Sequence, residues 1–141
     1  MEISAHIHSQ GSALEASVRS ADATRTLAIP AKREGRGSAV NGGELLMAAL
    51  ATCYCNDLYR EAARLGIAID GCEVTATAAF DGIGQGATRI SYSARVDSAA
   101  SIEQIELLLA ETDRLAEIHY TIRCGCPVER IAWGGAPAQA G

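Results

Sequence analysis

The sequence predicts an α+β fold built mostly from antiparallel strands, on three observations. Apolar and polar residues alternate in several short segments, a pattern typical of strands with one covered face. A long run of good helix formers ends at Gly66, and a second helical pattern begins at Ser101. Because the strands are grouped before and between the helices, their order favours α+β over an alternating α/β class.

Three strands are expected before residue 30. In the first two, apolar residues occupy every second position: Ile3, Ala5 and Ile7, then Leu14, Ala16 and Val18. A third strand is predicted over residues 24–29. Residues 30–43 are rich in Lys, Arg, Gly and Ser, so we expect a mobile loop there.

The segment NGGELLMAALATCYCNDLYREAARLG, residues 41–66, predicts a helix of roughly 22 residues. Cys55 falls in an apolar stripe of this helix and is interpreted as a packing residue, whereas Cys53 lies where the surface changes from aliphatic to polar. The predicted helix has an apolar stripe on one side and a partly apolar stripe on the other, so it needs two packing partners. We expect these to be the chain's own sheet and the same helix of a second subunit, in a symmetric homodimer.

The rest of the chain predicts a hairpin and further helices. Residues 74–80 and 90–96 alternate around the turn DGIGQG. Ser101 and Gln104 fit a capping box at the start of a helix that ends near Ile118, and residues 119–124 are ambiguous. Cys126 and Pro127 are expected to begin a short third helix. Residues 1–133 are then a single domain, and residues 134–141 are expected to be a disordered tail.

Composition excludes several classes of function. The formal net charge is −5, and the only basic run is the short AKREGR, so nucleic-acid binding is not expected. No segment approaches the ~18 apolar residues of a membrane span, and the N-terminus does not resemble a signal peptide. Five cysteines, an odd number, together with the missing export signal predict reduced thiols and a cytoplasmic location.

Two Cys-x-Cys pairs, Cys53-Tyr54-Cys55 and Cys124-Gly125-Cys126, could carry chemistry. In one interpretation Cys53 and Cys126 are a redox pair, in which a sulfenic acid on the first is resolved by the second. A four-thiolate zinc site is disfavoured, because side chains two residues apart on a helix diverge by about 200°. Buried packing residues are the third interpretation, since free cysteine is among the most buried residue types.

Other candidate groups have simpler interpretations. His6 and His8 share one face of a strand without a third ligand nearby, which favours solvent-facing histidines over a metal site. Asp57 and Arg60 have the spacing of a surface ion pair. Glu44 complements the helix dipole in the first turn of the long helix.

The stretch GGELLMAALATC, residues 42–53, followed by CPVERI, residues 126–131, resembles the OsmC/Ohr family of osmotically inducible and organic hydroperoxide resistance proteins. The resemblance covers residues 1–133, because the order of elements also agrees. It implies an OsmC-like fold in an intertwined homodimer, with the long helices central and the active sites at the interface. It also implies a reactive cysteine at Cys53 and a resolving cysteine at Cys126.

The chain departs from the family pattern near the start of the helix. The family's catalytic Glu falls on Gly43, and Glu44 follows one residue later, so it could substitute only with local unwinding. The family's thiolate-supporting Arg, from the N-terminal strands, has Arg19 and Arg25 as candidates here. Cys124 is an alternative resolving thiol, since one Gly separates it from Cys126.

The expected function is therefore a thiol-dependent peroxidase that reduces organic hydroperoxides in oxidative stress defence. Cys53 attacks the peroxide, Cys126 resolves, and an external dithiol reduces the disulfide, with no metal or organic cofactor. The alternative is an OsmC-like domain that binds a small apolar or thiol ligand at the dimer interface without efficient peroxidase turnover, because Gly43 replaces the family Glu.

Overall fold

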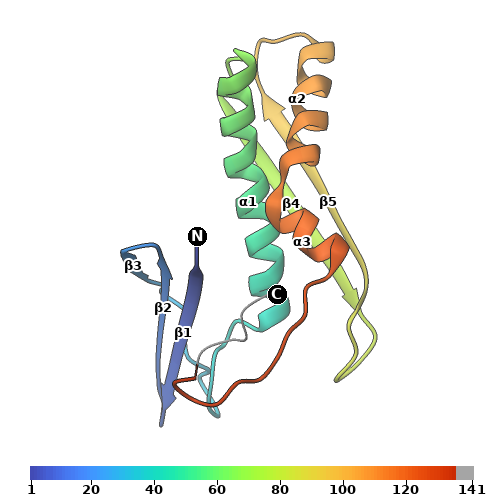
Figure 1. The fold of residues 1–141 in the computed structure, drawn as a ribbon. Helices are drawn as coiled ribbons and strands as arrows, with labels where there is room; N and C mark the ends of the chain where they lie inside the picture. The colour runs from blue at the N-terminus through green and yellow to red at the C-terminus, as the bar shows by residue number, and fades with distance from the viewer. Residues whose placement is uncertain (136–141) are drawn as a thin grey trace. The chain divides into compact units, whose positions relative to one another are not determined.

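The computed structural model describes residues 1–135, which fold into two compact units. The first unit contains residues 1–49 and 76–92, and the second contains residues 50–75 and the chain from residue 93 onward. The elements follow one another as three strands, a long helix, two strands and two helices (Figure 1). This order agrees with the predicted α+β class.

The N-terminal sheet is an antiparallel meander of β1 (Ile3–Gln10), β2 (Ala13–Ser20) and β3 (Ala23–Thr26). Ile3 pairs with Ser20 and Gln10 with Ala13, so β1 and β2 match over their full lengths. The predicted third strand is shorter than expected. After Thr26 the ladder ends with one further bond, from the Leu27 amide to the Ala16 carbonyl.

The predicted alternation of β1 does not produce a buried face. Every residue of the strand is exposed, including Ile3 at 64% and Ile7 at 52%. In β2 only Ala16 is buried. Nothing within the first unit therefore covers the apolar side of β1.

The second sheet is the hairpin of β4 (Gly71–Phe80) and β5 (Ala87–Asp97), as the sequence predicts. Alternate residues are half-buried on one face, at positions 72, 74, 76 and 78 of β4 and 90, 92, 94 and 96 of β5. The turn contains a bond from the Gln85 amide to the Gly82 carbonyl.

The long helix α1 spans Gly42–Leu65 and ends at Gly66, whose φ of 68° is a left-handed conformation that glycine adopts readily. Its buried residues are Leu50, Tyr54, Asp57, Leu58, Glu61 and Ala62. The buried stripe is not the all-apolar stripe that was predicted to contain Cys55. It passes through Tyr54 and includes two carboxylates, Asp57 and Glu61. Cys55 is only half-buried at its edge.

Packing in the second unit joins α1 to α2 (Ile102–Leu115). Leu58 and Leu108 are fully buried, and the Tyr54 hydroxyl donates to the Asp113 carboxylate at 2.8 Å. Arg64 bridges Glu61 of its own helix and Glu111 of α2. Apolar contact and a partly buried ion-pair network therefore hold the two helices together.

Two predictions at the C-terminal end were wrong. The second helix does not run to Ile118: it ends at Leu115, Ala116 has extended dihedral angles, and a separate helix α3 covers Glu117–Cys124. No helix begins at Cys126. Gly125, at φ 66° and ψ 154°, ends α3, and Pro127 disfavours helical dihedral angles in the residue before it. Residues 126–135 have no regular structure, and of the predicted tail residues 136–141 lie outside the described chain.

No helix in the described part of the chain is long and apolar enough to cross a membrane.

Candidate functional site: a thiol between two carboxylates

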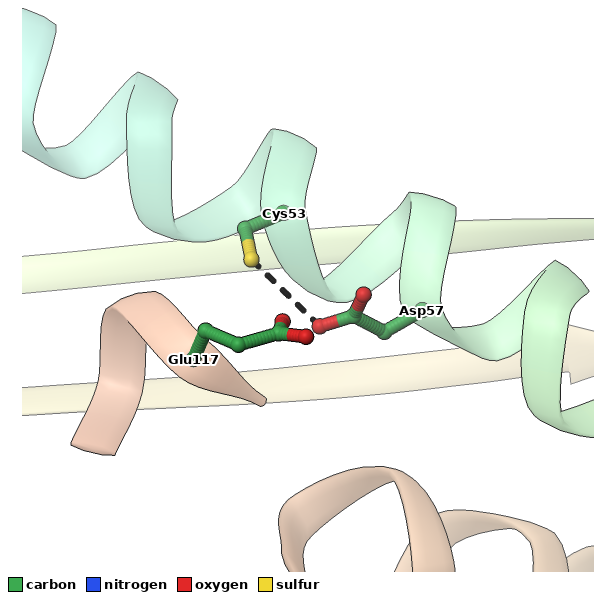
Figure 2. Close-up of side chains that lie close together, drawn as sticks. All are labelled: Cys53, Asp57 and Glu117. Carbon is green, nitrogen blue, oxygen red and sulfur yellow. Dashed lines mark hydrogen bonds between the residues drawn. The ribbon is translucent and has the colours of Figure 1, made fainter. Parts of the chain in front are cut away.

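Cys53 is half-buried on α1, one turn before Asp57. Because residues four apart stack on the same side of a helix, the Cys53 thiol reaches the Asp57 carboxylate and donates to its Oδ2 at 3.3 Å. Glu117, the first residue of α3, directs its carboxylate toward the same point (Figure 2). The ligand atoms of the three residues lie within 4.8 Å of one another.

Arg60 is the cation of this site. Its Nη1 lies 2.9 Å from Asp57 Oδ1 and 3.2 Å from Glu117 Oε1, so one guanidinium bridges both carboxylates. The predicted pair between Asp57 and Arg60 therefore exists. It is not a surface pair, because the Asp57 side chain is only 7% exposed.

Opposing effects act on the Cys53 thiol, and the net result raises its pKa above the ordinary value. Burial is the largest effect, and both the hydrogen bond to Asp57 and the charges of Asp57 and Glu117 act in the same direction. A hydrogen bond from the Ile118 backbone lowers the pKa. This amide belongs to the first turn of α3, where amides lack helical partners and favour negative charge.

The Asp57 carboxyl is also displaced from its ordinary behaviour. Burial raises the pKa of Asp57, while the Cys53 thiol and the Arg60 charge oppose that rise. A carboxylate with a raised pKa in contact with a thiol is a suitable proton acceptor for it. Next to it, buried His119 has a lowered pKa because of burial and the Arg123 charge, which favours a neutral imidazole.

The same cluster could in principle coordinate a cation, since it offers one thiol and two carboxylates. Arg60 already bridges both carboxylates, and a divalent ion would have to displace it. The four-cysteine zinc arrangement has no support in the structure, since Cys55 contacts Cys72 rather than Cys53.

The other predicted site residues have defined positions. Glu44 accepts from the Asn41 amide at 2.8 Å, and its own amide donates to Asn41 Oδ1, so its carboxylate caps α1. Arg19 and Arg25 are exposed on β2 and β3, and Arg19 Nε donates to the Ala21 carbonyl. Cys124 ends α3, and Cys126 follows two residues later; both are exposed free thiols.

Gly43 is tightly surrounded. A Cβ atom there would lie 3.2 Å from Asn41 Oδ1 and 3.4 Å from the Phe80 ring. Two open clefts of ≈ 750 and ≈ 470 Å³ border Gly43 and Phe80 in the first unit. Gly43, on which the family's Glu falls in the motif comparison, therefore lies at the edge of two surface clefts.

The sequence interpretation placed Asp57 near Cys53 on the helix but assigned it to a surface pair with Arg60. It missed Glu117 and the Ile118 amide as neighbours of the thiol. The spacing of Cys53 and Asp57 was a usable signal, since it places both side chains on one side of the helix. Glu117 and Ile118 gave no such signal, because their position depends on the helix break at Ala116.

Structural comparison finds a similar fold in OsmC-like proteins. An organic hydroperoxide resistance protein OsmC from Legionella pneumophila is 20% identical, with a TM-score of 0.57 over 87% of this chain and 90% of its own. An OsmC-like protein from Mycoplasma pneumoniae is 19% identical, with a TM-score of 0.59 over 86% of each chain. A Vibrio cholerae protein with captopril bound in one of its active sites is 23% identical, with a TM-score of 0.57 over 87% of this chain and 85% of its own.

The family model of OsmC-like proteins matches residues 35–130, and the chain belongs to that family. A search of curated protein sequences gave no significant match.

Proposed function

We propose that the chain is a thiol-dependent peroxidase that reduces organic hydroperoxides through Cys53. The observation that supports this most is the hydrogen bond from the Cys53 thiol to Asp57 at 3.3 Å, beside the first-turn amide of Ile118. It supplies a proton acceptor and a thiolate-stabilising donor where the family motif expects the reactive cysteine. The names of family relatives, which include hydroperoxide resistance proteins, support the same substrate class.

In the first step the hydroperoxide oxidises Cys53, and Asp57 carries the proton that the step transfers. The Cys53 proton passes to Asp57, and the thiolate attacks the distal oxygen of the hydroperoxide. The O–O bond breaks, Cys53 becomes a sulfenic acid, and the alkoxide leaves as an alcohol with the proton that Asp57 held. Arg60 keeps Asp57 in place throughout, because it binds the oxygen that does not face the thiol.

In the second step Cys126 attacks the sulfenic acid, which forms a disulfide and releases water. Cys124 is the alternative resolving thiol, and both are exposed free thiols. An external dithiol then reduces the disulfide by thiol exchange. We retain Arg19 and Arg25, from the N-terminal strands, as proposed supports of the Cys53 thiolate. Glu44 can take part only if its carboxylate is released from the helix cap.

The test compares Cys53→Ser with Cys55→Ser, the same substitution two residues further along α1. Peroxide consumption by each protein is followed with cumene hydroperoxide and a dithiol reductant. We expect Cys53→Ser to fall to the rate without enzyme and Cys55→Ser to retain the wild-type rate. Unchanged turnover in Cys53→Ser would reject the proposal.

A second candidate function is binding of a small apolar ligand without efficient turnover. It is favoured by the absence of the family Glu at Gly43 and by the clefts beside Phe80. The Vibrio cholerae relative with captopril in an active site supports the idea that this fold accepts small ligands. Wild-type protein that consumes no peroxide with any dithiol, yet gains thermal stability with captopril or a fatty acid, would favour this function.

A further inference from the structure

A second pair of thiols lies apart from the cluster at Cys53. Cys55, on α1, and Cys72, the second residue of β4, have sulfur atoms 3.3 Å apart although they are 17 residues apart in the chain. Both are free and half-buried. On the helix, Cys55 and Cys53 diverge by about 200°, so the second pair faces away from Asp57.

The two sulfurs need only a small approach to form a bond. A disulfide has an S–S distance of about 2.05 Å, so closure requires a movement of roughly 1.3 Å shared between two side chains. Rotation about side-chain torsions can supply a movement of this size. We propose that Cys55 and Cys72 form a reversible disulfide, which is a redox modification site distinct from the proposed peroxidase pair.

Both thiols of the pair are partly exposed to solvent, so a small dissolved molecule can reach them. A surface cavity of ≈ 550 Å³ is lined by Cys72 and neighbouring residues of β4 and β5. Its charged walls include Glu73 and Arg95, which pair at 2.7 Å, together with Asp97. A small water-soluble molecule suits these polar surroundings better than an apolar hydroperoxide, so the oxidant in this proposal is a low-molecular-weight peptide disulfide such as oxidised glutathione.

The reaction is two thiol exchanges. The Cys72 thiolate attacks one sulfur of the peptide disulfide, which forms a mixed disulfide and releases one peptide thiol. Cys55 then attacks the Cys72 sulfur and releases the second. In total, one peptide disulfide and two protein thiols give one protein disulfide and two peptide thiols, so electrons and protons balance.

The surroundings of Cys72 determine the conditions of the test. Burial raises the pKa of Cys72, the neighbouring Cys55 adds to the rise, and the Tyr59 hydroxyl opposes it. Because exchange requires the thiolate, the reaction is slow at neutral pH and should be followed at about pH 8.

The experiment uses the full chain with Cys53, Cys124 and Cys126 replaced by Ser, so that only Cys55 and Cys72 remain. The protein is equilibrated with glutathione buffers of increasing oxidation, and free thiols are alkylated and counted by intact mass. We expect both thiols to disappear together without a glutathione adduct. Stable adducts, or two thiols that remain free in the most oxidising buffer, would overturn the proposal.

Two further measurements keep the test independent of the variant's folding and of peroxidase activity. Tryptic mapping of oxidised wild-type protein should give a cross-link between the peptides that contain Cys55 and Cys72. In the four-residue variant that also carries Cys72→Ala, the cross-link must be absent and Cys55 must remain alkylatable or carry glutathione. Closing a loop of this length should raise the thermal midpoint of the triple variant by about 5–10 °C, and an unchanged or lower midpoint would argue against the pair as a stabilising link.

Discussion

At the scale of single residues, the state of Cys53 depends on neighbours with opposite effects. Burial and the two carboxylates favour the protonated thiol, whereas the Ile118 amide favours the thiolate. The raised pKa favours the protonated thiol, whose proton is directed at the Asp57 carboxylate. This differs from the usual activation of a reactive cysteine by a directly adjacent cation, because Arg60 acts through the carboxylates.

Replacing Asp57 by Asn should change two properties of Cys53 in opposite directions. Loss of the charge and of the anionic acceptor lowers the pKa of Cys53, so alkylation by iodoacetamide should reach its plateau at lower pH. Peroxide turnover at pH 7 should nevertheless fall by about 10²-fold, because no carboxyl group returns the proton to the leaving alkoxide. The measurements are alkylation rate and cumene hydroperoxide turnover between pH 6 and about 10, a range that spans ordinary thiol titration.

The control for this variant is Asp70→Asn, an exposed carboxylate elsewhere in the same unit. It should leave both profiles unchanged. If Asp57→Asn instead raises turnover in step with alkylation, Asp57 only suppresses the thiolate and is not a proton carrier.

At the scale of elements, the sequence could predict those helices, strands and caps that depend on patterns within a few residues. The hairpin, the long helix with its end at Gly66 and the capping box at Ser101 follow from alternation, helix formers and side-chain chemistry within a few residues. The break at Ala116 could not be predicted this way. Helical spacing continues across it, and its position depends on packing: Ala116 is 1% exposed, and Arg60 binds the Leu115 carbonyl and the Glu117 carboxylate.

In the candidate site, too, the sequence could predict only what depends on local spacing along the chain. The cysteine motifs singled out Cys53, and helical periodicity placed Asp57 near it. The contact between Cys55 and Cys72 could not be found, because it depends on how β4 lies against the helix. The sequence alone indicates that Cys55 is a packing residue.

The capping box of α2 gives a prediction for this element. The Ser101 hydroxyl accepts from the Gln104 amide at 3.2 Å, and Gln104 Oε1 accepts from the Ser101 amide at 3.1 Å. Ser101→Ala should cost about 1 kcal/mol and lower the thermal midpoint by about 2–4 °C. Ser101→Asp, which retains an N-cap acceptor, should restore the wild-type midpoint. Equal losses in both variants in a calorimetric scan would show that the cap is not the cause.

At the scale of the whole molecule, many large apolar side chains are exposed within their own units. They include Ile3 and Ile7 of β1, Ile102 and Leu107 of α2, and Val128 and Trp133 near the C-terminus. A single soluble subunit rarely leaves so much apolar surface exposed, and contiguous apolar patches are typical of interfaces. The expected homodimer would cover part of it.

The apolar side of β1 allows a direct test of the homodimer. Wild-type protein should sediment as a dimer of two 14.7 kDa chains. The double variant Ile3→Lys with Ile7→Lys places two charges on the face that the dimer would cover. We therefore expect its dimer dissociation constant to rise at least 10-fold. The matched control is Ser4→Lys with His8→Lys, on the opposite face of the strand, which should leave the dissociation constant unchanged. Monomeric wild-type protein at micromolar concentration, or equal effects of the two double variants, would show that β1 is not part of a dimer interface.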